Sequence, residues 1–166
     1  MFNTNVYSGA DGTLAFGDPT GMDADVFGKY FGETGQVGRV TNVSVAVSTR
    51  VKAFHEMGSH APKEIRAGNI EISGSVERAY INGALLRLML GKDATDEETP
   101  PLKMPTFNIK LILDNMLPEG DAGNSVLTLY DVIFDSWQFN LPEDDFVLER
   151  ATFRARRIAV TDTEAG

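Results

Sequence analysis

The chain contains no cysteine among its 166 residues, and its basic residues are outnumbered by acidic ones. Without cysteine, neither a disulfide framework nor a thiolate metal site can form. Residues 1–5 lack a basic region followed by an apolar run, so we expect no secretory signal. The most apolar segment, residues 84–90, is short and contains Arg87, which argues against a transmembrane helix. We therefore expect a soluble protein made in a reducing compartment, with no membrane partner.

The shortage of positive charge restricts the possible partners. The formal net charge is −9 and the pI is near 4.6. Proteins that bind nucleic acid tightly neutralise phosphates with Lys and Arg, so tight DNA binding is disfavoured. A surface beside which DNA moves without sticking remains compatible with this charge. With 42% hydrophobic content, residues 1–166 are expected to form a single domain.

Residue patterns typical of catalysis are also missing. No Gly-x-Ser-x-Gly nucleophile elbow occurs. Carboxylates that could share a strand face, such as Asp131 and Asp135, are more often solvated edge residues than acid–base pairs. The two histidines, His55 and His60, have too few neighbouring ligands for a metal site. We expect no enzymatic activity, no catalytic residue, no cofactor and no metal.

A long alternating pattern dominates residues 39–80. Apolar residues occupy every second position of residues 43–53, and small or polar residues lie between them. The same alternation covers residues 69–77, so each strand has one apolar and one polar face. At about 3.3 Å per residue, a strand over residues 40–54 would reach roughly 50 Å. The sequence therefore predicts a hairpin far longer than a compact monomer needs.

The connection predicted inside this hairpin is residues 55–68, a loop of 14 residues with mixed charge. A loop of this length in a small domain is usually functional or disordered. We expect it to contact a neighbouring protein through exposed polar side chains. The candidates are His55, Glu56, His60, Lys63, Glu64 and Arg66.

Shorter elements flank this hairpin. Short strands are predicted over residues 2–7, 13–16 and 106–113, and a helix over residues 82–90 with Asn82 as its cap and Gly91 as its stop. Leu85, Leu86 and Met89 share one face of that helix, which favours packing against a sheet. Irregular segments are predicted over residues 17–38 (an ordered, aromatic-packed loop with one helical turn), 93–101 and 114–124.

A second long hairpin is predicted over residues 126–140 and 146–160, joined by residues 141–145. The alternation slips within residues 130–135, which indicates a bulge. Long hairpins leave unpaired edges that soluble proteins normally cover, and copies of the same chain could cover them. A ring of copies could then close into one large barrel with the polar faces lining a water-filled bore.

The predicted fold class is thus mainly β, an antiparallel sandwich or partial barrel with one short flanking helix. Its two long hairpins would form a tube-lining barrel on oligomerisation, and the loop over residues 55–68 would reach the adjoining ring. The predicted bore-facing residues are Ser44, Ser48, Arg50, Glu71, Ser73, Ser75, Glu77, Gln138, Arg154 and Arg156.

Several short motifs follow one another in a familiar order. They are Ser-Gly-Ala-Asp-Gly-Thr-Leu at residues 8–14, Gly-x-Val-x-x-Val at 38–43, Pro-Lys-Glu-Ile-Arg-Ala-Gly at 62–68 leading to Ile-Ser-Gly-Ser-Val at 72–76, and Asp-Phe-Val-Leu-Glu at 145–149. In this order of elements the chain resembles the tail tube proteins of tailed bacteriophages, which are related to tube proteins of contractile injection systems.

The resemblance implies a structural virion protein whose six-membered rings stack into a tail tube. Sheath, baseplate or tail-tip and terminator proteins are its implied partners, while tape measure protein and genomic DNA pass through a mostly acidic lumen. Its implied location is the virion tail, and the host cytoplasm during assembly. Here the predicted bore also carries cations, among them Arg50, Lys52 and Arg154. The alternatives are a ring-forming adaptor or completion protein, an injection-system tube protein and a monomeric ligand-carrying β-barrel.

Overall fold

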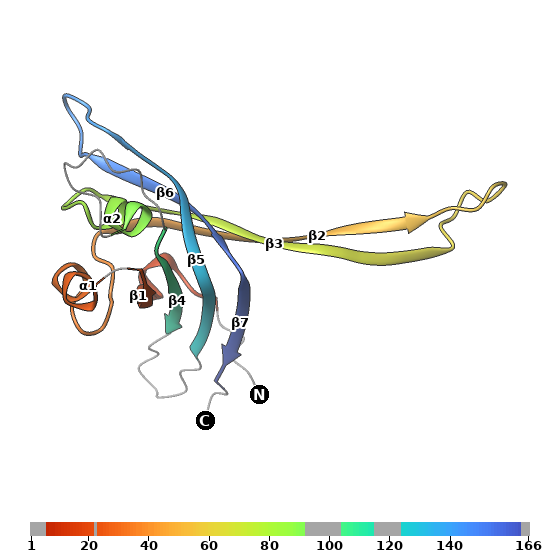
Figure 1. Cartoon of the computed structure of the whole chain (residues 1–166), viewed down its shortest axis with the longest axis horizontal. Coiled ribbons are helices and arrows are strands. Elements are labelled where there is room, and N and C mark those ends of the chain that lie inside the picture. Colours follow the sequence, from red (N-terminus) through yellow and green to blue (C-terminus); the bar gives the residue numbers. More distant parts are fainter. Residues whose placement is uncertain (1–5, 22, 92–103, 115–123, 164–166) are drawn as a thin grey trace.

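The computed structural model describes residues 6–21, 23–91, 104–114 and 124–163 (Figure 1). The expected mainly β, antiparallel architecture is confirmed: seven strands form one continuous sheet that does not close on itself. In order, the elements are the 3-10 helix Gly9–Asp11, β1 Gly12–Thr20, α1 Ala24–Phe31, β2 Val40–Phe54, β3 Glu64–Ala79, α2 Ala84–Leu90, β4 Thr106–Asp114, β5 Asn124–Asn140, β6 Leu148–Ala155 and β7 Arg157–Asp162. Neither helix of the described chain is long and apolar enough to span a membrane.

Strand β5 belongs to two differently oriented parts of this sheet. Residues 124–130 pair with β4 on one side and β7 on the other, and β1 continues this part beyond β4. Residues 133–140 pair with β6, which is followed by β3 and β2. We call β1, β4, β7 and the first half of β5 the body sheet. The arm sheet consists of β2, β3, β6 and the second half of β5.

A bend at Asp131 and Arg156 separates the two sheets. Asp131 has a positive φ of 53°, and Arg156 interrupts the last long strand between β6 and β7. The Arg156 backbone N–H donates to the Tyr130 carbonyl at 3.0 Å across the bend. The predicted irregularity in residues 130–135 is therefore confirmed, whereas the predicted continuous strand over residues 146–160 is wrong.

The core lies between the apolar faces of the two sheets. The Phe16 ring packs against the rings of Phe107 and Phe134, with centroids 5.1 and 6.0 Å away. Phe153 packs from β6 over Gly74, where a Cβ atom would lie 2.1 Å from the Ser44 carbonyl oxygen and 2.5 Å from the Phe153 Cζ. Gly74 thus has a packing role, because any side chain there would clash with both the β2 backbone and the Phe153 ring.

Both helices cover this core. Helix α1 lies within the loop predicted over residues 17–38 and is longer than the single turn expected there. Its buried Phe27 and Phe31 side chains pack it against the body. In α2 the buried residues are Ala84, Leu85 and Leu88. The predicted face was therefore partly wrong, because Leu86 and Met89 are only half-buried.

The predicted ends of α2 are largely confirmed. The Asn82 side-chain oxygen accepts the Ala84 backbone N–H at 3.1 Å, although Gly83 occupies the cap position itself. Gly91 ends the helix with a φ of 83°. Three predicted segments lie wholly or partly outside the described residues: the loop 93–101, residues 115–123 of the turn, and residues 1–5 of the first strand. The two described residues of that first predicted strand, 6 and 7, are not in a strand.

The predicted first hairpin is confirmed, and Figure 1 shows it projecting far from the rest of the molecule. Strand β6 pairs with β3 only from Ile72 to Ala79, so residues 64–71 have no strand partner other than β2. We call residues 47–71 the arm. The predicted loop was too long, because β3 begins at Glu64 and only residues 55–63 connect the strands. Glu64 and Arg66 are therefore strand residues.

A buried ion pair ties the base of the arm sheet to α2. The Arg78 Nε donates to Glu149 Oε1 at 2.5 Å, and the two side chains are 2% and 0% exposed. Trp137 Nε1 donates to the other carboxylate oxygen at 2.9 Å, and Arg78 Nη2 donates to the Asn82 side chain at 3.1 Å. These bonds satisfy both charges where water cannot reach them.

Breaking this pair should therefore destabilise the fold strongly. We expect Arg78→Ala to lower the free energy of unfolding by about 3–5 kcal/mol, because it leaves the Glu149 carboxylate buried without its partner. Arg78→Met combined with Glu149→Leu should cost less than either single change. Urea unfolding at low protein concentration measures both. Arg66→Ala, which breaks the exposed pair with Glu64, is the control and should cost less than about 1 kcal/mol. Equal losses at both pairs would contradict this view of the core.

Candidate functional site

The polar face of the arm sheet carries a row of hydroxyl groups that crosses all its strands. Ser44 lies opposite Ser75, Ser75 opposite Thr152, and Thr152 opposite Ser136. The Ser44 and Ser75 hydroxyls are 2.9 Å apart, and the Thr152 hydroxyl donates to the Asp135 carboxylate. Because these groups bond to one another, the row is polar without carrying free charge.

Three arginines on or beside this face lie next to carboxylates, whereas Arg150, which lies on the same face opposite Glu77 and Gln138, is exposed and makes no ion pair with the described residues. Arg154 Nε is 3.5 Å from an Asp135 oxygen, and Arg50 Nη2 is 4.0 Å from a Glu71 oxygen. At the bend, Arg156 is 3.5 Å from Asp131. These pairs are largely exposed, so they contribute little to stability. Their effect is on the surface potential, because each of these three arginines presents its charge together with a negative group.

The structure brings most of the predicted bore-facing residues together. The strand register places one group on the same face: Ser44, Ser48, Arg50, Glu71, Ser73, Ser75, Glu77, Gln138 and Arg154. Arg156 lies apart from them at the bend. Ser75 is buried within the hydroxyl row, and Glu77 is half-buried beside Thr41, whose hydroxyl donates to it at 3.3 Å. Glu71 is exposed, so neither acidic residue is buried against α2. That this face lines a bore stays a prediction.

The opposite face of the arm is apolar and uncovered. Val51 and Ile70 are 59% and 65% exposed, and Val47 and Ile65 are similarly exposed. The register shifts between Thr49 and Val51, whose partners on β3 are Ile70 and Ala67. This bulge inserts an extra residue on β3 and so keeps the apolar side chains on one face. The result is an apolar stripe along the arm that lacks a packing layer within the molecule.

The arm sheet also has two unpaired edges in the described structure. Strand β2 pairs only with β3, and residues 133–140 of β5 pair only with β6. Since each neighbouring pair is antiparallel, β2 runs opposite to β5. A second copy could therefore place its β5 edge beside β2 and continue the antiparallel pattern.

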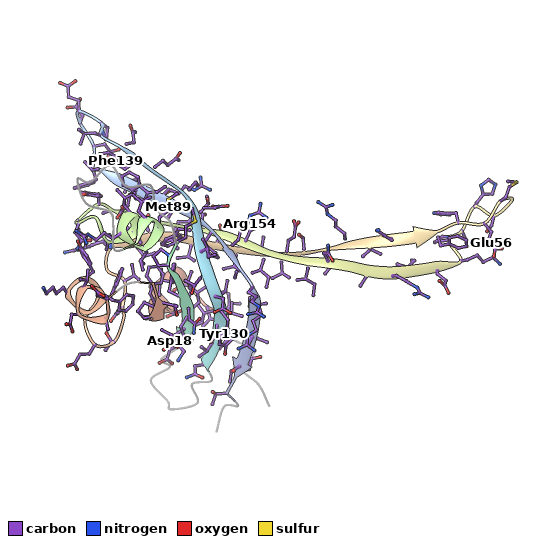
Figure 2. The ribbon with its side chains drawn as sticks, in the orientation of Figure 1. Asp18, Glu56, Met89, Tyr130, Phe139 and Arg154 are labelled. Atoms are coloured by element: carbon purple, nitrogen blue, oxygen red, sulfur yellow. The ribbon has the colours of Figure 1, made fainter. Side chains whose placement is uncertain are left out.

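The predicted contact residues lie at the far end of the arm, where Figure 2 labels Glu56. His55, Glu56, His60 and Lys63 are exposed in the connection, and Glu64 and Arg66 are exposed on β3. Weak pairs join Lys63 to Glu56 at 3.9 Å and Arg66 to Glu64 at 3.4 Å. Within the described residues, no three or more His, Asp or Glu side chains come close enough to hold a metal ion.

A groove of about 430 Å³ lies where the sheet fails to close. Strands β1 and β4 form one side with Leu14 and Leu111, and the start of β2 forms the other with Val40 and Val43. This groove separates two sheet regions, whereas the ligand-carrier alternative requires the interior of a closed barrel.

Two features of the site were not predicted from the sequence. One is the Arg78–Glu149 pair. Each of these charged residues occupies a strand position where the alternation calls for an apolar side chain, and this departure is the sequence signal that could have indicated a buried pair. The other is an exposed apolar cluster around the β5–β6 turn, where the Tyr80 and Phe139 rings pack with centroids 5.5 Å apart. Residues from distant segments form this cluster, so spacing along the chain does not reveal it.

Comparison with known proteins gives matches only among solved structures. No family model matches the sequence, and no curated protein matches it. A chain of the anti-feeding prophage baseplate, 6-fold symmetrised, matches with a TM-score of 0.64 and 16% identity over 96% of this chain and 97% of that one.

Two further structures agree. A chain of the PVC sheath-tube complex, from an extracellular contractile injection system in its extended state, matches with a TM-score of 0.63 and 10% identity over 96% of this chain and 94% of that one. The SPP1 tail tube matches with a TM-score of 0.61 and 10% identity over 96% and 81%. The resemblance to tail tube proteins that the sequence indicated is confirmed at the level of the fold.

Proposed function

We propose that this chain is a structural, non-enzymatic protein that assembles through its arm sheet into stacked rings, forming the inner tube of a phage tail or contractile injection machine. The observation that carries this proposal is the arm itself, with an uncovered apolar stripe next to unpaired strand edges. Apolar surface of this kind is rare on monomers and marks interaction sites. The fold shared with the SPP1 tail tube supports the same conclusion.

The strand directions are compatible with ring closure. If β2 of each copy pairs with residues 133–140 of the next, antiparallel order continues around the ring without a free edge. Six copies agree with the 6-fold symmetry of the matching baseplate and the C6 symmetry of a matching gene transfer agent tail. With four arm-sheet strands per copy, the barrel would contain 24 strands and be wide enough for an aqueous channel.

The covered side of the arm sheet decides which face turns inward. The body sheet and α2 already pack against its apolar face, so the body lies outside the ring. The hydroxyl row and its neighbouring ion pairs then line the bore. The bore would present hydroxyls and mostly paired charges, with Arg150 as an exposed cation, and this low density of free positive charge is compatible with genomic DNA or a tape measure protein passing through without tight binding.

The matching structures also suggest partners. They include a sheath-tube complex, a baseplate and a tube-terminating cap. We propose contacts with sheath, baseplate or tail-tip and terminator proteins through the outer surface and ends of the tube, in the virion tail or injection machine.

Electron microscopy of the purified protein, combined with sedimentation over a range of concentrations, tests the proposed assembly. We expect rings that stack into tubes of uniform bore as concentration rises. Single rings at every concentration would favour a ring-forming adaptor. Strict monomers would refute assembly through the arm sheet.

The apolar stripe can be tested directly. We expect Val51→Lys with Ile70→Lys to abolish rings and tubes at concentrations where the unchanged protein assembles, because lysines cannot be buried between copies without a large penalty. Monomer stability should change little, since both side chains are exposed. Val160→Lys on β7 is a matched control, because Val160 is 62% exposed on the body sheet. Loss of assembly in this control, or normal tubes from the double variant, would contradict the proposed role of the stripe.

The paired charges of the bore make a separate prediction. Removing the carboxylates through Glu71→Gln and Asp135→Asn leaves the neighbouring Arg50 and Arg154 unpaired. We expect the double variant to bind DNA measurably at low salt and to lose affinity steeply as salt rises, with a log–log slope steeper by up to about 2.

The control for this effect removes the same negative charge from the exposed body. The control changes are Asp23→Asn and Asp25→Asn, at exposed residues on or beside α1. Fluorescence anisotropy with a labelled duplex measures both variants. Equal gains in DNA affinity would show that net charge alone is responsible, and no gain in the bore variant would refute the masking of arginines by carboxylates.

A further inference from the structure

The groove between the body sheet and the start of β2 has an apolar lining. Leu14, Val37 and Leu111 line its body side, and Val40 and Val43 line the side formed by β2. None of the described residues that line it is charged. The first residues of β2 also form a strand edge, because β2 pairs only with β3 in the described chain. The groove can therefore accept apolar side chains carried by a strand that pairs with this edge.

An exposed apolar patch lies around the β5–β6 turn, at the opposite edge of the arm sheet. We call it the turn patch, and it consists of Tyr80, Ile81, Phe139, Leu141, Phe146 and Leu148. Figure 2 labels Phe139 there, at the opposite end of the molecule from the arm. Phe139 stacks on Trp137 with ring centroids 5.3 Å apart, and both lie on the strand face opposite that of Gln138. The turn patch therefore extends the apolar layer of the arm sheet to its β5 edge.

The groove and the turn patch lie at the same end of the arm sheet but on opposite edges. The strand register connects Val40 to Arg78, Arg78 to Glu149 and Glu149 to Phe139. If β2 of one copy pairs with β5 of the next in antiparallel order, the end of β5 lies beside the start of β2. The stagger that closes a barrel shifts the exact register but keeps these two ends together. Each turn patch then lies at the mouth of a neighbour's groove.

The charges beside the two surfaces are opposite in sign. Arg39, directly before β2, is exposed and makes no ion pair with any described residue. Its φ of 61° lies in the left-handed region, and residues held in that region are concentrated at functional sites. The turn carries the exposed Glu143, Asp144 and Asp145, with no basic residue beside them in the sequence. The turn of a neighbouring copy therefore supplies the negative charge that Arg39 does not meet within its own chain.

We propose that the turn patch of one copy inserts Phe139 and Leu141 into the groove of the next copy in the same ring, with the acidic turn against Arg39; this inference rests on the proposed ring. The contact is heterologous, because the groove and the turn patch are different surfaces, and such contacts close a ring where the rotation permits. It also selects for copies of this chain, because a partner must present apolar side chains and an acidic turn together.

The absence of cysteine allows a direct test by cross-linking. Thr41 lines the groove and Leu141 belongs to the turn patch, and both are exposed. We expect Thr41→Cys and Leu141→Cys, made in separate chains and assembled together, to form a covalent dimer with a short bifunctional thiol reagent. Thr41→Cys assembled with Val160→Cys is the control and should form no dimer, because Val160 is exposed on the body sheet, away from the turn patch.

Lysines in the turn patch test the apolar part of the contact. Leu141 and Phe146 are 72% and 83% exposed, so Leu141→Lys with Phe146→Lys should leave the monomer folded. We expect this variant to raise the concentration at which rings form by about tenfold or more, because lysines would have to be buried in the groove. Sedimentation over a range of concentrations measures this shift. Val160→Lys is the control and should leave the ring-forming concentration unchanged.

Charge reversal tests the polar part. We expect Arg39→Glu alone, and Glu143→Lys with Asp144→Lys alone, each to raise the ring-forming concentration by about fivefold, because groove mouth and turn then repel each other. An equimolar mixture of the two should assemble like the unchanged protein, since alternating copies restore opposite charges at every contact. Lys110→Glu is the control for Arg39→Glu, because Lys110 is exposed on the face of β4 opposite to that of Leu111, and it should have no effect.

These outcomes separate the inference from the proposed function. Rings without the covalent dimer overturn the inference and leave ring assembly intact. The same holds if the lysine variant or the single charge variants assemble like the unchanged protein, or if the mixture assembles no better than its components. An unchanged protein that forms no rings overturns the proposed function and this inference together.

Discussion

A ribbon of two strands cannot bury its own apolar face, and this constraint shapes the whole molecule. Where the arm sheet is four strands wide, the body sheet and α2 cover its apolar side. Where only β2 and β3 continue, the same alternation places Val51 and Ile70 in contact with solvent. An exposed strand edge beside exposed apolar side chains promotes uncontrolled association unless a specific neighbour covers both. The exposed stripe and strand edges of the arm are therefore the features on which the proposed assembly depends.

The body serves mainly to hold the arm sheet in position. The bend at Asp131 and Arg156 turns a single long hairpin into parts of two sheets, whose inner faces form one aromatic core. The Arg78–Glu149 pair then fixes the base of β3 to β6 and, through Asn82, to α2. A rigid base matters because small changes in its angle are amplified along the length of the arm. Buried ionic pairs contribute little net stability but penalise other arrangements, which suits this role.

Particular residues show how far the sequence alone could be interpreted. Alternation from Val43 to Ala53 led to a predicted strand over residues 40–54, the same bounds as β2, because a half-exposed strand leaves a period of two in the sequence. The same period failed at Glu64 to Gly68, since the bulge beside Val51 shifts the register and small or charged residues obscure the pattern. The length of helix α1 was underestimated as a single turn because Gly28 and its flanking glycines favour loops, whereas burial of Phe27 and Phe31 against the body outweighs that preference.

The features of the candidate site likewise fall into those that the sequence determined and those that the tertiary structure decided. The sequence by itself determined which side chains share a strand face, and so it placed Ser44, Glu71 and Arg154 together, because alternation depends only on local backbone geometry. Only the tertiary structure decided that Arg78 meets Glu149, that Asp131 and Arg156 make the bend, and that Tyr80, Phe139 and Phe146 gather at one end. Those contacts join residues far apart in the chain, and their positions depend on register and sheet packing, which a local pattern does not encode.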